Sequence, residues 1–269
     1  MNLKSLAVRS ISGAVYCAII VICILLGADA VTIMLSVFGA LAVIEFTKIC
    51  LDLSVRRIPP LLLDIAGIIC LCFTPIYIFP ILLWLAVMVC RFIEELYIKD
   101  PEPIRNLAHS MMNQIYIGIP LASAAGLASW FESSHILLLV FLFLWINDTG
   151  AFLVGCTIGK HRLFERISPK KSWEGFWGGV VINLIAAALL CTYCNNFFGL
   201  PQQLWIWLST AAIVSIFGTF GDLVESLIKR SLHIKDSGNI IPGHGGILDR
   251  IDSLLLAAPA VLLFLFMVI

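Results

Sequence analysis

The segment from Ser226 to Asp252 combines more charge and glycine than any other part of this chain of 269 residues. It reads SLIKRSLHIKDSGNIIPGHGGILDRID and lies between two long apolar stretches. Carboxylates suit a hard cation such as Mg²⁺, which takes one or two of them together with substrate phosphates. Basic side chains and glycine-rich backbone suit the phosphates themselves. The segment therefore predicts chemistry on phosphate groups assisted by a metal ion.

Four polar residues around the start of this segment recur at helical spacing. They are Asp222, Glu225, Ser226 and Lys229, and a helix places all four on one face. Acids at the inner end of a membrane helix are costly unless they are paired or bind a cation. Two explanations stay open: an internal network of Asp222–Ser226 and Glu225–Lys229 contacts, or a cation site.

The glycine-rich part of the segment is not expected to be helical, because Pro242 and three glycines surround His244. Such a loop brings backbone N–H groups close to a ligand, although a tight re-entry turn has a similar composition. Asp249 and Asp252 follow on one face of the next predicted helix. Their carboxylates are further candidate metal ligands.

A second polar stretch, ISPKKSWEG at residues 167–175, precedes a glycine-rich helix start. Its hydroxyl and ammonium groups suit phosphate binding, or they serve only as a positively charged anchor beside the membrane. Asp148 lies inside the preceding apolar span, where an ionisable residue is a candidate for function. An interhelical hydrogen-bond cluster is the alternative explanation for Asp148.

The composition predicts an all-α, polytopic integral membrane protein. The chain is 61% hydrophobic and 13% charged, with a mean hydropathy of +1.03, whereas soluble domains are about 45–50% apolar and about 25% charged. The third expected span is the shortest and contains Asp64. Three arrangements stay open for it: tilted, re-entrant or packed inside the bundle. The first span is interpreted as a helix rather than a cleaved signal. About nine transmembrane helices are expected, near residues 11–27, 30–48, 60–74, 76–94, 112–131, 135–157, 175–195, 203–228 and 250–269.

The basic residues predict a cytoplasmic N-terminus. With that orientation, all 17 Lys and Arg residues fall in or beside the expected cytoplasmic segments. Those segments are 1–10, 49–59, 95–111, 158–174 and 229–249. By character, the chain divides into apolar helices at 1–105 and a catalytic transmembrane region at 106–269, within one membrane-embedded domain.

The segment 226–252 resembles the signature of the phosphatidate cytidylyltransferase family, also called CDP-diglyceride synthases. The resemblance rests on Ser226-x-Ile228-Lys229-Arg230-x₄-Lys235-Asp236-x-Gly238-x₂-Ile241-Pro242-x-His244-Gly245-Gly246-Ile247-x-Asp249-Arg250-Ile251-Asp252. Earlier stretches agree with the family as well, so that the resemblance covers about residues 140–269. They are Asn147-Asp148-Thr149, Gly159-Lys160 and Ser168-Pro169-Lys170-Lys171-Ser172-Trp173-Glu174-Gly175.

This resemblance implies transfer of the cytidylyl group of CTP to phosphatidic acid, giving CDP-diacylglycerol and pyrophosphate for phospholipid biosynthesis. It implies Mg²⁺ as the cofactor, held by Asp222, Asp249 and Asp148. It implies catalytic roles for Asp222, Asp249, Lys229, His244 and Asp252. It also implies a substrate-binding set: Ser168, Lys170, Lys171, Ser226, Arg230, Lys235, Asp236, Gly245, Gly246 and Arg250.

The expected partners are CTP, phosphatidic acid and the lipid bilayer, with no nucleic acid, and a homodimer is left open. The expected location is the cell inner membrane, with the active site facing the cytoplasm.

Lys229 is expected to lie beside the acids and to act on kcat, whereas Lys171, one loop away, is expected to act on the KM of one substrate. The alternative function is a transporter with an intramembrane acidic cation site. A CDP-alcohol phosphotransferase is excluded, because its DGxxAR-type motif needs an Asp-Gly pair that this chain lacks.

Overall fold

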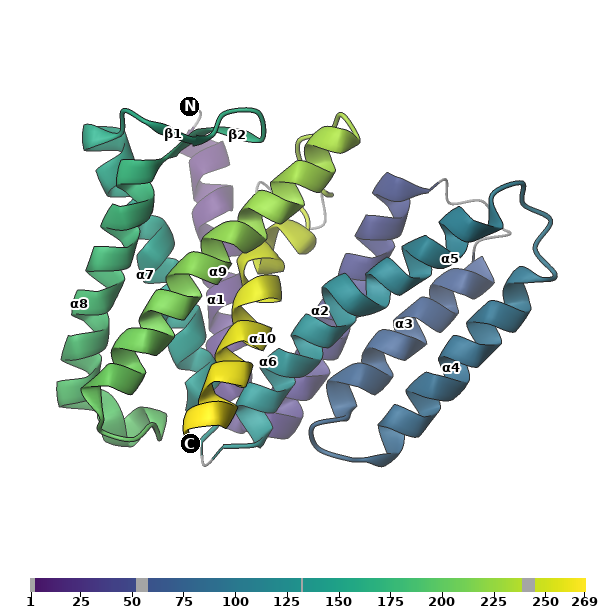
Figure 1. The fold of residues 1–269 in the computed structure, drawn as a ribbon, viewed down its shortest axis with the longest axis horizontal. Helices are drawn as coiled ribbons and strands as arrows, with labels where there is room; N and C mark the ends of the chain where they lie inside the picture. The colour runs from purple at the N-terminus through teal and green to yellow at the C-terminus, as the bar shows by residue number, and fades with distance from the viewer. Residues whose placement is uncertain (1–2, 52–57, 132, 239–244) are drawn as a thin grey trace. The chain divides into compact units, whose positions relative to one another are not determined.

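The computed structural model describes residues 3–51, 58–131, 133–238 and 245–269, and it is mostly helical (Figure 1). The predicted helical class is thereby confirmed in its main part. One correction is a short antiparallel hairpin of β1 (Arg162–Phe164) and β2 (Ser168–Ser172). The chain forms two compact units, one of Met1–Trp130 with Asp236–Arg250 and one of Phe131–Lys235 with Ile251–Ile269. The predicted functional division at residue 105 stays a prediction.

The first unit contains the N-terminal helices and part of the signature segment (residues 226–252). Three helical segments follow one another without a break between Pro103 and Ser129: an α-helix, a π-helix and a second α-helix. Polar residues of the π segment point to α3, because Asn113 Nδ2 donates to Asp64 Oδ2 (2.8 Å) and Gln114 Nε2 donates to the Asp64 carbonyl (3.0 Å). The elements are α1 (Leu3–Leu26), α2 (Ala28–Cys50), α3 (Ile58–Phe73), α4 (Phe79–Glu95), α5 (Pro103–Met112), η2 (Asn113–Gly118) and α6 (Ile119–Ser129).

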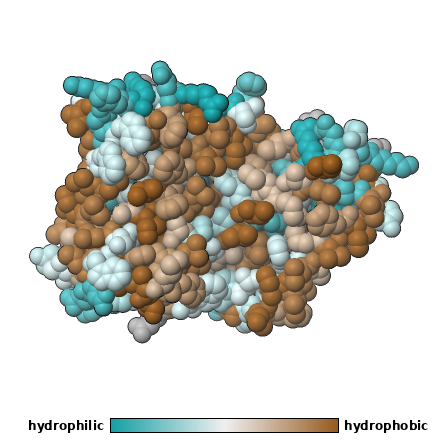
Figure 2. Space-filling view, viewed as in Figure 1, coloured by the Kyte–Doolittle hydropathy of each residue, from teal (hydrophilic) through white to brown (hydrophobic). Residues whose placement is uncertain are grey.

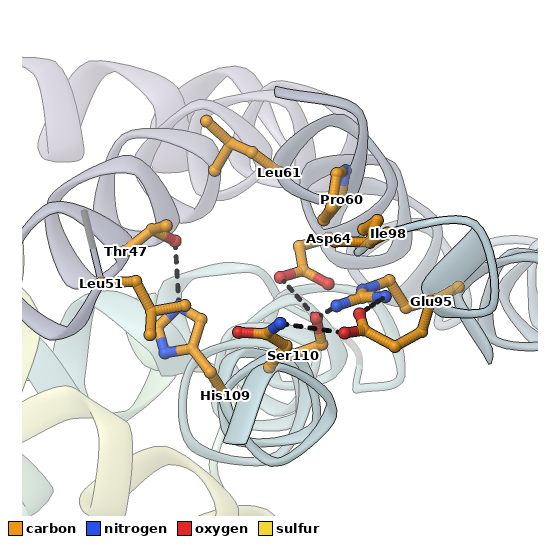
Figure 3. A pocket seen from close by; sticks show the side chains of 11 residues that line it. Thr47, Leu51, Pro60, Leu61, Asp64, Glu95, Ile98, His109 and Ser110 are labelled. Carbon is orange, nitrogen blue, oxygen red and sulfur yellow. Dashed lines mark hydrogen bonds and ion pairs between the residues drawn. The ribbon is translucent and has the colours of Figure 1, made fainter. Parts of the chain in front are cut away.

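Asp64 packs inside this unit, as one of the three arrangements considered for the third span predicts. Its side chain is 2% exposed and accepts a hydrogen bond from Ser110 Oγ (3.1 Å). Arg91 donates to Ser110 Oγ and to Glu95 Oε2, both at 2.8 Å. Figure 3 shows Asp64, Ser110 and Glu95 pointing toward one another around a cavity of about 20 Å³, room for about one water molecule.

The second unit contains the hairpin and the longest helices. They are α7 (His135–Ile158), α8 (Trp173–Phe198), α9 (Leu204–Ser231) and α10 (Leu248–Val268). The first three residues of α10 belong to the first unit. Glycines bring α7 and α8 together: a Cβ on Gly175 would lie 2.8 Å from the Ala151 carbonyl oxygen. Small residues allow such backbone approach between membrane helices.

Within the part of the chain that the structure describes, five helices are long and apolar enough to cross a membrane: α2, α7, α8, α9 and α10. Large apolar side chains such as Trp177, Val181 and Ile185 are exposed along one side of α8. Figure 2 shows apolar surface over the helices of the second unit and hydrophilic surface at the end that carries the hairpin. So much exposed apolar surface is stable in lipid and costly in water. The chain is a multi-pass membrane protein.

Candidate active site

A cavity of about 330 Å³ in the second unit gathers several of the predicted site residues. Asp148 on α7, Lys170 and Lys171 on β2 and Asp222 on α9 all line it. Its volume lies in the range of small-molecule sites. Acids and cations from three elements therefore face one space.

An ion pair joins two sides of this cavity. Lys171 Nζ lies 2.7 Å from Asp222 Oδ2, and both side chains are partly exposed. The expectation that Lys171 lies one loop away from the acids is wrong, because the hairpin carries Lys171 across to α9. The two residues are far apart in sequence, so that helical spacing could not show this contact.

The polar face of α9 forms the internal network that was one of the two predicted explanations. Ser226 Oγ donates to Asp222 Oδ1 (3.2 Å), and Lys229 Nζ pairs with Glu225 Oε2 (2.9 Å). Glu225 is 1% exposed, and a carboxylate so deeply buried needs such a partner. Catalytic roles for Ser226 and Lys229 remain predictions.

Asp252 on α10 lies near the two acids that line the cavity. It lies within electrostatic range of Asp222 and Asp148. Gly221 makes this arrangement possible, because a Cβ there would lie 2.5 Å from the Asp252 carbonyl oxygen. The backbones of α9 and α10 are thus in contact directly beside Asp222.

The interhelical contact expected at Asp148 is made by its neighbour instead. Asn147 is buried, and its Nδ2 reaches Thr219 Oγ1 on α9 at 3.5 Å. Asp148 itself lines the cavity. Asn147 lines the same cavity, so the two neighbours both face the candidate site, and Asn147 also contacts α9.

The hairpin is fixed to α8 by side-chain contacts at the helix start. Ser172 Oγ accepts from the Gly175 N–H (3.1 Å) and caps α8. Glu174 accepts from the backbone N–H of Lys160 (3.0 Å) and of His161. Because β2 ends at the start of α8, these contacts also fix the position of the two cavity lysines on β2. Ser168, the first residue of β2, is half-buried.

Two further predicted substrate residues lie near the end of α9. Arg230 Nε donates to the Ile167 carbonyl (3.4 Å), and its Nη1 donates to the Ile234 carbonyl (3.2 Å). Lys235 is exposed. Arg230 thus ties the end of α9 to the turn of the hairpin within the second unit.

In the first unit, Asp249 organises the described part of the glycine-rich loop. Its Oδ2 accepts from Ser237 N (3.1 Å), Ser237 Oγ (2.9 Å) and Gly246 N (2.9 Å). Gly245 has φ of +83°, and a Cβ there would lie 2.7 Å from Asp249 Oδ2. The conformation of Gly245 and its closeness to Asp249 both require glycine.

The remaining predicted residues of the loop are placed more simply. Asp236 is exposed, as is Arg250, whose carbonyl accepts from the Tyr16 hydroxyl (3.0 Å). His244 lies outside the described residues. Binding roles for Gly245, Gly246 and these residues remain predictions.

Sequence reasoning missed Glu45 on α2. Its carboxylate is 2% exposed and accepts from the backbone N–H groups of Ile247 and Leu248 in the signature segment. The available signal was an acid inside the apolar span predicted at 30–48, near its C-terminal end.

Fold and site define a helical, multi-pass membrane protein with acids and cations around one cavity. The chain belongs to the cytidylyltransferase family, whose sequence model matches residues 7–268. The resemblance seen in the signature segment is thereby confirmed.

Several relatives carry the name phosphatidate cytidylyltransferase. Those of Staphylococcus haemolyticus (strain JCSC1435) and Staphylococcus aureus (strain COL) are 41% and 43% identical over 161 residues. The protein of that name from Staphylococcus epidermidis (strain ATCC 35984) is 38% identical over 161 residues. In each comparison, the similarity spans 60% of this chain and 60% of the relative.

Proposed function

We propose that this protein transfers the cytidylyl group of CTP to phosphatidic acid, releasing pyrophosphate and forming CDP-diacylglycerol. The names of its relatives and its family membership support this activity. The observation that carries it is the cavity in which Asp148, Asp222 and Lys171 meet. Such a mixture of acids and cations fits a reaction between two phosphate-bearing substrates.

The chemistry needs no nucleophile from the protein. An oxygen of the lipid phosphate attacks the α-phosphorus of CTP, a new P–O bond forms, and the bond to the β-phosphate oxygen breaks. Pyrophosphate leaves with that electron pair. The protein must hold two anions in line and neutralise the charge on the leaving group. Lys170 and Lys171 are the cavity cations suited to this work.

The acids fit Mg²⁺ as the cofactor. Asp148 and Asp222 line one cavity, and Mg²⁺ is held by one or two carboxylates together with waters and substrate phosphates. Asp222, Asp148 and Asp249 are the proposed ligands, and bound Mg²⁺ would offset charge on the phosphates.

Replacement of Lys171 by alanine should lower kcat, rather than only raise a KM. Its ammonium lies against Asp222, a proposed metal ligand, so it is placed to act on the reacting phosphates. Loss of one charge-assisted contact should cost roughly 1.5–3 kcal/mol, or roughly 10- to 150-fold in rate. Steady-state kinetics with each substrate varied in turn measures this. Arg166→Ala, an exposed cation in the same hairpin, is the matched control, and an unchanged kcat in Lys171→Ala would contradict the assignment.

We further propose that the protein lies in the cell inner membrane and crosses it about nine times. The N-terminus and the active site would face the cytoplasm. Within the second unit, the basic segments share one end, since Lys171 pairs with Asp222 and Arg230 contacts Ile167. Residues 133–134 and 199–203 share the other end, where the His135 ring contacts the Phe197 carbonyl (2.7 Å) and Gly199 lies beside Ser133. This separation supports the positive-inside orientation.

Cysteine labelling tests that orientation in a cysteine-free background. Labels at Ser54, which lies outside the described residues, and at Glu165 should react only with reagents that enter the cytoplasm. The sequence pointed to position 198 for the outside label, but Phe198 is only 3% exposed. Gln202 is exposed and should react with an impermeant reagent added outside. Identical behaviour of positions 165 and 202 would contradict this topology.

A further inference from the structure

Glu45 on α2 makes direct contacts with the signature segment, although about 200 residues separate them in sequence. Its Oε1 accepts from the Ile247 N–H (3.0 Å), and its Oε2 accepts from the Leu248 N–H (3.0 Å). Ser237 Oγ also donates to Oε2 (3.4 Å). One buried carboxylate thus contacts the segment on both sides of its glycine-rich loop.

These contacts have a clear electrostatic reason. Leu248 is the first residue of α10, and the first N–H groups of a helix have no partner within the helix. They also carry the positive end of the helix dipole, which favours a carboxylate. In most helices a nearby Ser, Thr, Asp or Asn provides this cap. Here the cap comes from another helix, so it fixes where α10 begins relative to α2.

Two signature glycines are explained by the same carboxylate. A Cβ on Gly238 would lie 2.5 Å from Glu45 Oε1, and a Cβ on Gly246 would overlap Ser237 Oγ and Glu45 Oε2. A larger residue at either position requires the backbone there or the side chains of Glu45 and Ser237 to shift. Close approach to Glu45 is therefore one reason for these glycines, whatever they bind in addition.

Ser237 links Glu45 to a proposed metal ligand. Its Oγ lies 3.4 Å from Glu45 Oε2 and 2.9 Å from Asp249 Oδ2. The Gly246 N–H also donates to Asp249 Oδ2 (2.9 Å), immediately before the two N–H groups that Glu45 binds. Displacement of the loop from Glu45 would thus change the hydrogen bonds that orient Asp249.

We propose that Glu45 is a positioning residue of the active site, which holds Ser237 and residues 246–248 in the conformation that presents Asp249. It acts through the loop and touches no substrate. This role rests on the proposed cytidylyl transfer. Without Glu45, turnover falls and more Mg²⁺ is needed for half-maximal activity, because Asp249 loses its fixed orientation.

Glu45→Gln tests this role in the full chain, reconstituted in lipid nanodiscs. Glutamine has nearly the same shape, but it keeps one acceptor oxygen and presents N–H groups toward a backbone N–H. The amides of Ile247 and Leu248 should exchange with deuterium about tenfold faster or more, measured by mass spectrometry. kcat should fall about tenfold or more in the folded protein, and the Mg²⁺ concentration for half-maximal activity should rise.

Glu95→Gln is the matched control. Glu95 is also a buried acid of the first unit, and it accepts from Arg91 (2.8 Å) and from Asn106 (2.9 Å), both outside the signature segment. Its replacement should lower thermal stability without changing exchange at Ile247 and Leu248 or the Mg²⁺ requirement. Gly238→Ala provides a second approach to the same contact, and should reproduce the exchange and Mg²⁺ effects of Glu45→Gln.

The outcomes separate this role from general stability and from the proposed function. Unchanged exchange at Ile247 and Leu248 in both Glu45→Gln and Gly238→Ala would overturn the contact. Faster exchange with unchanged kcat and Mg²⁺ requirement would overturn the positioning role, as would equal effects in Glu95→Gln. If the unaltered protein forms no CDP-diacylglycerol, cytidylyl transfer fails and the positioning role fails with it, while the exchange measurement still reports on the contact itself.

Discussion

Replacement of Asp222 by asparagine is expected to lower kcat by about a hundredfold or more, because it removes a negative charge that faces the proposed Mg²⁺ and leaves the side-chain shape intact. Asp222 lines the cavity, pairs with Lys171 at 2.7 Å and accepts from Ser226. An asparagine oxygen can still accept a hydrogen bond there. The variant should therefore insert and fold, so that the loss falls on the chemistry.

The measurement is steady-state turnover of Asp222→Asn over a range of Mg²⁺ concentrations, with thermal unfolding as the test of folding. Glu165→Gln, an exposed acid in the turn of the hairpin, serves as the control and should retain normal turnover. Near-normal turnover of Asp222→Asn at limiting Mg²⁺ would remove Asp222 from the metal site.

Replacement of Asp249 by asparagine is expected to have an effect of the same size, about a hundredfold or more in kcat. Asp249 has a second task, because its Oδ2 accepts three hydrogen bonds from Ser237 and Gly246. Asparagine can place its oxygen at that position and keep these bonds. It then removes only the charge, which separates the metal role from support of the loop.

Two measurements on Asp249→Asn distinguish those tasks. Turnover should fall and should recover in part at high Mg²⁺, while hydrogen exchange of residues 245–250 should stay as in the unaltered protein. Asp249→Ala should change both. A variant Asp249→Asn with full turnover at low Mg²⁺ would show that Asp249 only supports the loop.

Hydropathy predicted the long helices well, because burial in lipid demands about 20 apolar residues whatever the tertiary contacts. The span expected at 135–157 is α7, His135–Ile158, and that expected at 30–48 is α2, Ala28–Cys50. The hairpin at Arg162–Ser172 was not predicted, because its strands are short, contain Pro169 and show no apolar alternation. Contacts of Glu174 and Ser172 attach it to the start of α8, and these contacts join residues that sequence patterns do not relate.

The site was predictable where its contacts are local. The Asp222–Ser226 and Glu225–Lys229 contacts follow from helical spacing alone. Contacts between distant segments were out of reach, as with Lys171 against Asp222 and Glu45 against Leu248. They depend on how glycines let backbones approach, as Gly221 does beside Asp252, and spacing carries no such information.

The most direct test of the proposed activity uses purified protein with phosphatidic acid, Mg²⁺ and CTP labelled at the α-phosphorus. The label should enter the lipid extract as CDP-diacylglycerol, in equal amounts to the pyrophosphate released, and only when phosphatidic acid is present. CTP labelled at the γ-phosphorus should leave the lipid unlabelled and label the pyrophosphate. Cation uptake into vesicles without any α-labelled lipid would contradict cytidylyl transfer and favour a transporter.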